Sequence, residues 1–194
     1  MKRGTLFIVF VVAAAIAIYC VKVYNGLASE QQGVEAAWSN VETQYQRRAD
    51  LIPNLVSTVK GYATHEQQTL EDVVAARAAA TSITLDGSNM TPAQFEEYVE
   101  AQNKVTSALG RLIAVAENYP DLKANTSFLE LQSQLEGTEN RIAVARREYN
   151  DIVKQYNTRV VTFPRNIIAS MFGFSQKEYF AAAEGASEAP KVEF

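Results

Sequence analysis

The stretch "FLELQSQLEGTENRIAVARREYNDIVKQY", residues 128–156, carries the most regular hydrophobic pattern in the chain. Its mostly apolar positions recur at steps that alternate between three and four: Phe128, Leu131, Leu135, Thr138, Ile142, Ala145, Tyr149, Ile152 and Tyr156. This alternation is typical of the seam of a left-handed coiled coil. The stretch therefore predicts one long helix that buries a single face against neighbouring helices.

Two further stretches repeat at helical intervals. The first contains Val34, Trp38, Val41, Tyr45, Ile52, Leu55, Val56 and Val59, and further on Leu70, Val73 and Val74; the second contains Phe95, Val99, Val105, Leu109, Leu112, Ile113 and Ala116. Strand-like alternation is nearly absent. The sequence predicts an all-α protein whose long helices form an antiparallel bundle.

The breaks between these stretches are marked by turn residues. Residues 84–92, "TLDGSNMTP", predict a loop, and Thr91 and Gln94 form a capping box for the helix that follows. Residues 118–125 predict a turn, after which Ser127 and Glu130 are expected to form a second capping box. The Phe163-Pro164 pair ends the long third stretch, since proline cannot continue a helix.

Pro53 lies inside the first helical stretch and leaves the helix count open. The apolar phase continues through it, which favours one long helix with the Ala49 carbonyl freed of its usual donor. Alternatively, Asp50 caps a new helix that has Pro53 in its first turn. The bundle has three long helices under the first interpretation and four under the second. The adjacent Arg47 and Arg48 are interpreted as part of a solvated kink rather than a ligand site.

The N-terminus predicts a membrane anchor, residues 1–22. Lys2 and Arg3 precede an uncharged apolar run over residues 4–21, which is about 27 Å long as a helix. This length approaches the hydrocarbon thickness of a bilayer, about 30 Å. No A-x-A-like cleavage site follows, so a retained anchor is favoured over a signal peptide. Since more positive charge precedes the run than the one lysine that follows it, the N-terminus is expected in the cytoplasm and the remaining domain outside the inner membrane.

Composition and motifs exclude several functions. The net charge of −4 argues against nucleic-acid binding. His65 and Glu66 begin a zinc-protease HExxH pattern, but Thr69 stands where the second histidine is needed, and the chain has no other histidine. A di-iron site, which needs two Glu-x-x-His pairs, is excluded for the same reason. We expect no catalytic residue, no metal or cofactor site and no enzymatic activity.

The interaction candidates lie in the C-terminal third. Tyr149, Asn150, Tyr156 and Asn157 form two Tyr-Asn pairs a heptad apart, which either fix the bundle register or bind a partner. Residues 163–174, "FPRNIIASMFGF", are apolar but too short to span a membrane. This segment, with Phe163, Phe172 and Phe174, is expected to cap the core or to dock on the membrane or a neighbour. The bundle is predicted to occupy residues 23–180, and residues 181–194 to form a flexible acidic tail.

Several blocks resemble one bacterial family. "RRADLIPNLV" from Arg47, "YPDLKAN" from Tyr119 and "ARREYNDIVKQYN" followed by "FP" are similar to the LemA family over residues 20–175. The resemblance implies a single membrane helix, a helical bundle and no established catalytic residue. It also implies a link to internal membrane shaping in magnetosome-forming relatives, and to membrane partners such as zinc metalloproteases and TPM-domain proteins.

These observations predict a non-enzymatic, single-pass protein of the bacterial inner membrane. We expect a homo-oligomeric scaffold that organises the cell envelope and binds other membrane proteins. The alternative is an adaptor that presents a binding groove to a membrane protease or another envelope protein.

Overall fold

The computed structural model describes residues 2–181 apart from 64, 86, 88 and 89. Within these residues it contains helices and no strand: α1 (Lys2–Lys60), α2 (Gln67–Ser82), α3 (Pro92–Ala116), α4 (Pro120–Lys123), α5 (Thr126–Val161) and α6 (Arg165–Met171). The predicted all-α architecture, a long apolar N-terminal helix followed by packed helices, is confirmed.

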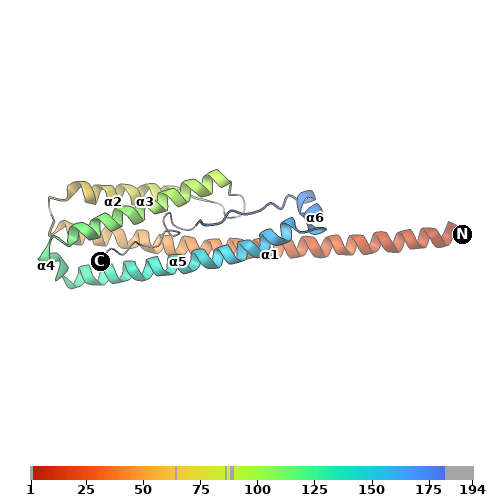
Figure 1. Cartoon of the computed structure of the whole chain (residues 1–194), viewed down its shortest axis with the longest axis horizontal. Helices are drawn as coiled ribbons and strands as arrows, with labels where there is room; N and C mark the ends of the chain where they lie inside the picture. The colour runs from red at the N-terminus through yellow and green to blue at the C-terminus, as the bar shows by residue number, and fades with distance from the viewer. Residues whose placement is uncertain (1, 64, 86, 88–89, 182–194) are drawn as a thin grey trace, which may run out of the picture.

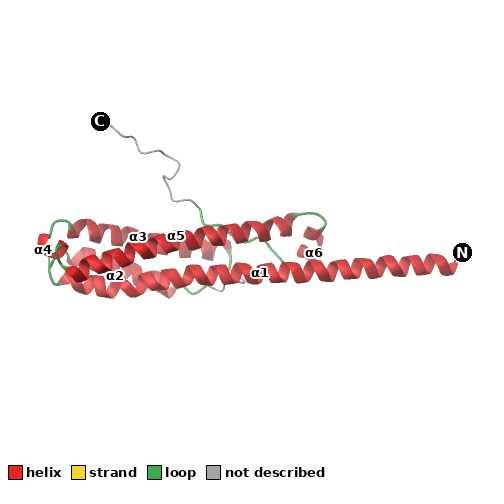
Figure 2. Cartoon of the chain, turned by 90° about the horizontal axis from the view of Figure 1, so that it is seen from below, coloured by secondary structure: helices red, strands yellow, loops and turns green. Residues whose placement is uncertain are grey.

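The bundle is formed by the four longest helices of the described residues, α1, α2, α3 and α5, which alternate in direction (Figures 1 and 2). The part of α1 that follows the apolar run packs on α5 and α2, and α2 packs on α3. The short helix α4 joins α3 to α5 at the end of the bundle far from the N-terminus. At the other end α6 packs against both α5 and α1.

Helix α1 runs without interruption through Pro53, so the interpretation in which Pro53 begins a new helix is wrong. The fourth helix arises instead from a turn at residues 61–66, which the apolar pattern did not reveal. His65 lies in this turn and not on a helix. The prediction of three long helices for a first helix that continues through Pro53 is therefore wrong, because the turn after Lys60 still gives a four-helix bundle.

The missing amide of Pro53 is replaced by a side chain. Proline cannot donate to the carbonyl four residues earlier, which leaves the Ala49 oxygen without its helical partner. Arg77 of α2 donates its Nε–H to this oxygen over 2.7 Å. The same hydrogen bond joins α2 to α1 at the level of the proline.

The bundle core is divided into two apolar clusters along its length. One includes Val34, Trp38, Val41 and Tyr45 of α1 with the C-terminal half of α5; the other includes Ile52, Leu55 and Val59 with α2 and most of α3. On α5 the predicted seam is buried at Phe128, Leu135, Thr138, Ile142, Ala145, Tyr149 and Tyr156, and partly buried at Leu131 and Ile152.

The predicted helix starts are confirmed in one case and wrong in the other. Thr91 and Gln94 form both hydrogen bonds of a capping box at the start of α3. Helix α5 begins earlier than expected: the Asn125 side chain accepts from the Phe128 amide over 3.0 Å, so Asn125 is its N-cap, in place of Ser127 with Glu130. The end of α5 at Val161, just before Phe163-Pro164, agrees with the prediction.

The first third of α1 projects beyond the bundle (Figure 1). Its large apolar side chains between Leu6 and Val21 are exposed. By length and composition, α1 is the one helix among the described residues that could cross a membrane.

The chain does not stop at α6. Residues 172–181 turn back and run in an extended conformation along the bundle (Figure 1), an arrangement that the sequence pattern did not predict. Of the predicted flexible tail, residues 182–194 lie outside the described part of the chain.

Replacing Arg77 by methionine is expected to destabilise the bundle by about 1–3 kcal/mol, because the Ala49 oxygen loses its donor. The cost should be smaller in a Pro53→Ala background, where the restored amide of residue 53 can donate instead. Thermal or denaturant unfolding of the detergent-solubilised chain measures this coupling. Arg111→Met is the control, because the ion pair of Arg111 with Asp72 is exposed and contributes about 0–1 kcal/mol. If Arg77→Met lowers the free energy of unfolding equally in the wild-type and Pro53→Ala backgrounds, Arg77 does not replace the missing amide of Pro53.

Candidate interaction surfaces and the buried polar layer

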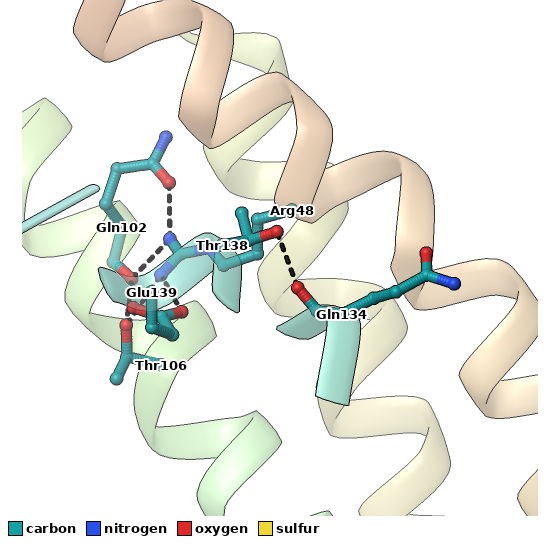
Figure 3. Close-up of polar contacts among 6 residues, drawn as sticks. All are labelled: Arg48, Gln102, Thr106, Gln134, Thr138 and Glu139. Atoms are coloured by element: carbon teal, nitrogen blue, oxygen red, sulfur yellow. Dashed lines mark hydrogen bonds and ion pairs between the residues drawn. The ribbon is translucent and has the colours of Figure 1, made fainter. Parts of the chain in front are cut away.

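A buried arginine lies at the centre of the bundle. Arg48 is 1% exposed, and its guanidinium reaches two other helices (Figure 3). Nη1 donates to the Thr106 hydroxyl over 2.7 Å and to Glu139 Oε1 over 2.9 Å. Nη2 donates to the Gln102 side-chain oxygen over 2.7 Å and to its backbone carbonyl over 3.1 Å. One side chain of α1 therefore binds α3 at three oxygens and α5 at one.

This polar layer separates the two apolar clusters. The cluster nearer the apolar run of α1, here called the proximal cluster, ends at Tyr45, Tyr98 and Ile142. The other, the distal cluster, begins at Ile52, Ala101 and Leu135. Thr138 is also buried in this region and donates its hydroxyl to the Gln134 carbonyl over 2.7 Å (Figure 3). The helices can thus satisfy the buried charge only in this register.

The interpretation of both arginines as part of a solvated kink is correct for Arg47, which is exposed, and wrong for Arg48. A signal was available in the spacing: Arg48 lies three residues after Tyr45 and four before Ile52. It therefore occupies a seam position of the helix. This position predicts that Arg48 is buried, but it does not predict which residues of α3 and α5 bind its guanidinium.

The asparagines of the two Tyr-Asn pairs bind the chain's own C-terminal segment. Asn157 accepts from the Lys177 amide and donates to the Lys177 carbonyl, both over 2.8 Å. Asn150 makes the same pair of hydrogen bonds with Phe180, both over 2.9 Å. Arg146 continues the row by donating to the Ala181 carbonyl. Residues 177–181 are therefore held mainly through their backbone, as a strap along α5.

The heptad between the asparagines matches the geometry of an extended chain. Seven residues of helix rise about 10.5 Å. Three residues of extended chain, from Lys177 to Phe180, cover about 10 Å. The repeat of the Tyr-Asn pair therefore places each carboxamide opposite a backbone amide and carbonyl of the strap.

Phe180 anchors the strap in an aromatic cluster. Its ring stacks on Trp38 with a centroid distance of 5.9 Å and an interplanar angle of 9°. It also contacts Phe95 at 5.0 Å and Tyr149 at 5.3 Å, and the Arg146 guanidinium lies 4.7 Å from its centroid. The strap thus packs beside α1 and α5 and adds Phe180 to the aromatic cluster around Trp38.

Tyr149 and Tyr156 are buried in the bundle. Burial, together with the nearby negative charge of Glu30, raises the pKa of Tyr156 to about 12. Its hydroxyl has no hydrogen-bond partner among the described residues. A partner-binding role for these tyrosines and for Asn150 and Asn157 stays a prediction, and it would require the strap to leave.

The three phenylalanines of the 163–174 segment lie at the opposite end of the strap. Tyr24 of α1 contacts the rings of Phe172 and Phe174 at 5.0 and 5.6 Å. Phe174 is partly buried, whereas Phe163 and Phe172 are exposed. The segment therefore caps the core with one side and leaves the other side open.

A charged pair lies next to this end of the bundle. Glu30 of α1 forms an ion pair with Arg159 of α5. Burial raises the pKa of the Glu30 carboxyl above its usual value, and this effect outweighs the charges of Arg159 and Arg165. The pair links α1 to α5 close to the start of α6.

The fold and these contacts define an all-helical bundle carried on a long apolar N-terminal helix, with an extended C-terminal strap. A family model described as the LemA family matches residues 37–194. The chain belongs to the LemA family, as its motifs indicated.

Relatives with similar sequences include both LemA and magnetosome proteins. Protein LemA of Metamycoplasma hominis is 27% identical over 160 residues, which cover 82% of this chain and 69% of the relative. Magnetosome protein MamQ 2 of Paramagnetospirillum magneticum is 29% identical over 174 residues, and magnetosome protein MamQ of Magnetospirillum gryphiswaldense is 26% identical over 176. These alignments cover 81% of this chain and 64% of each MamQ protein, so the chain spans about two-thirds of the length of its relatives.

Substituting Arg48 by methionine is expected to destabilise the bundle on the order of 3 kcal/mol, because the buried Gln102 oxygen loses its donor and Glu139 its partner. Arg47→Met is the matched control: the neighbouring arginine is exposed, and its loss should cost less than about 0.5 kcal/mol. Denaturant unfolding followed by circular dichroism compares the two. If both variants unfold alike, the polar layer does not contribute to stability.

Proposed function

We propose that this LemA-family protein is a non-enzymatic scaffold, anchored by one pass in the bacterial inner membrane, that self-assembles in the organisation of the cell envelope. The N-terminus lies in the cytoplasm and the bundle on the extracytoplasmic side, as the charges at Lys2, Arg3 and Lys22 favour. Similarity to two proteins named magnetosome proteins supports a membrane setting.

The observation that carries this proposal is the continuity of α1. Residues 4–21 form the apolar run, and the same helix continues to Lys60 as part of the bundle. The bundle portion, residues 23–60, is about 57 Å long at the rise of an α-helix. With no loop between the two parts, the bundle is held at a fixed angle to the bilayer, which suits a structural role.

A surface for self-association lies between α1 and α2. A groove there is lined by the apolar residues Val56, Leu70, Val74, Ala75 and Ala78, together with Lys60, Gln67 and Glu71. Two copies anchored in one membrane are related most simply by a twofold axis along the membrane normal. That axis brings α1 of one copy against α2 of the other, so that Lys60 meets Glu71 at the rim on both sides.

Val74→Asp is expected to dissociate this assembly, because it places a charge in the apolar contact. Val144→Asp is the matched control: Val144 is 49% exposed against 48% for Val74, but it lies on α5 beside Asn140, Arg141 and Glu148. Light scattering of the full-length protein in detergent and in nanodiscs measures the mass. A wild-type protein that is strictly monomeric and has no co-purifying partner would refute the scaffold.

The second candidate function is an adaptor, and the strap favours it. Asn150 and Asn157 of α5 bind backbone groups of the strap. The site that holds the strap therefore accepts an extended segment with little dependence on its sequence, apart from an aromatic residue at the position of Phe180. In this role an extended segment of a membrane partner, such as a zinc metalloprotease or a TPM-domain protein, displaces the strap.

A chain truncated after Ser175 tests the adaptor. Provided that circular dichroism shows it folded, it is expected to bind a peptide of residues 175–181, whereas the intact chain is not, because its groove is occupied. A Phe180→Ala peptide should bind at least about tenfold more weakly, since the buried ring supplies most of the apolar contact. Equal binding of both peptides, or none to the folded truncated chain, would refute this role.

A further inference from the structure

An apolar stripe on and beside α6 is largely exposed in the part of the chain that the structure describes. Ile167 and Met171 are one helical turn apart and are 53% and 73% exposed. Phe163 and Phe172, just before and after the helix, are 75% and 54% exposed. On the opposite side of α6, Ile168 and Ala169 are buried in the proximal cluster. This helix is thus apolar on two sides, and only one of them is covered.

The stripe lies at the level where the apolar run of α1 ends. Phe172 contacts Tyr24, which follows Val21 by three residues, a rise of about 4.5 Å along the helix. Cys20, in the last turn of the run, packs partly against the cluster that contains Ile168 and Ala169. Both views show α6 beside α1 at the end of the bundle that faces the projecting N-terminal part (Figures 1 and 2).

The exposed surface of α6 therefore continues the exposed apolar surface of α1. Ile18, Tyr19 and Val21 of the run are also exposed, as a lipid-facing helix requires. Basic side chains lie nearby: Lys22 and Arg165 are exposed, and Arg159 forms an ion pair with Glu30, the acidic group on which the charge of Arg165 also acts. Aromatic and aliphatic side chains next to basic residues are the composition of segments that settle at the headgroup boundary.

We propose that α6, with Phe163 and Phe172, inserts into the interfacial layer of the leaflet from which α1 emerges. The occupant of the stripe is lipid, with a preference for anionic headgroups. This inference rests on the proposed membrane anchoring. A helix of seven residues would bind a bilayer weakly alone, but α1 holds it at the membrane surface, where its effective concentration is high. This second contact fixes the rotation of the bundle about α1.

The test uses the full-length chain with Cys20→Ala, reconstituted in vesicles of phosphatidylcholine and phosphatidylglycerol. Single cysteines at Ile167 or Met171 carry an environment-sensitive fluorophore, and lipids brominated near the headgroup or near the chain end report its depth. Val12→Cys, in the middle of the apolar run, is the control for anchoring. Val144→Cys is the control for an exposed apolar position far along α5.

Labels at 167 and 171 are expected to be quenched more by bromine near the headgroup than by bromine near the chain end. The label at 12 should show the reverse order, and the label at 144 no quenching. Replacing phosphatidylglycerol by phosphatidylcholine should reduce the quenching at 167 and 171.

Two results would overturn this inference while leaving the anchor intact. One is quenching of the label at 12 without quenching of the labels at 167 and 171. The other is crosslinking of the cysteines at 167 or 171 between two copies of the chain, which would show that a second copy covers the stripe in place of lipid. Absence of quenching at 12 would instead refute the proposed anchoring.

Discussion

The structure depends on one buried charge. The Arg48 guanidinium lies between two apolar clusters, and its oxygen acceptors come from α3 and α5. Sliding α1 by one turn, about 5.4 Å, would move the charge toward one of the two clusters and away from the acceptors that α3 and α5 supply at its present level. Apolar contacts tolerate small shifts, whereas this layer does not. It therefore sets the register in which the apolar faces of α1, α3 and α5 meet.

The two halves of the bundle are completed by different means. Helix α2 has 16 residues and α5 has 36, so α2 covers only the part of α1 that is distal to its apolar run. In the proximal half, the strap and α6 take the place of further helices. Phe180 stacks on Trp38 there, and the asparagine side chains supply the hydrogen bonds that the extended backbone would otherwise lack. The asparagines of the Tyr-Asn repeat thus hold the strap on the part of the bundle that α2 does not cover.

The sequence predicted what depends on local periodicity and local hydrogen bonds. The seam from Phe128 to Tyr156, the Thr91 capping box and the stop at Pro164 are of this kind. The sequence pattern did not predict the turn after Lys60, because apolar residues continue at helical spacing on both sides of it. The donation from Arg77 to the Ala49 carbonyl and the pairing of Asn157 with Lys177 join residues 28 and 20 positions apart, and no pattern within one helix encodes such partners.

Helix α5 connects all of these features. Along its length it carries Glu139 of the polar layer, then Asn150 and Asn157 of the strap site, then Arg159, which pairs with Glu30, and it leads directly into α6. As one continuous helix of 36 residues it is about 54 Å long and cannot absorb a displacement at one end by bending at a loop. The Glu30–Arg159 pair, the strap site and the acceptor Glu139 of Arg48 are therefore held at fixed spacings by one helix, which links the end of the bundle beside α6 to its buried polar layer.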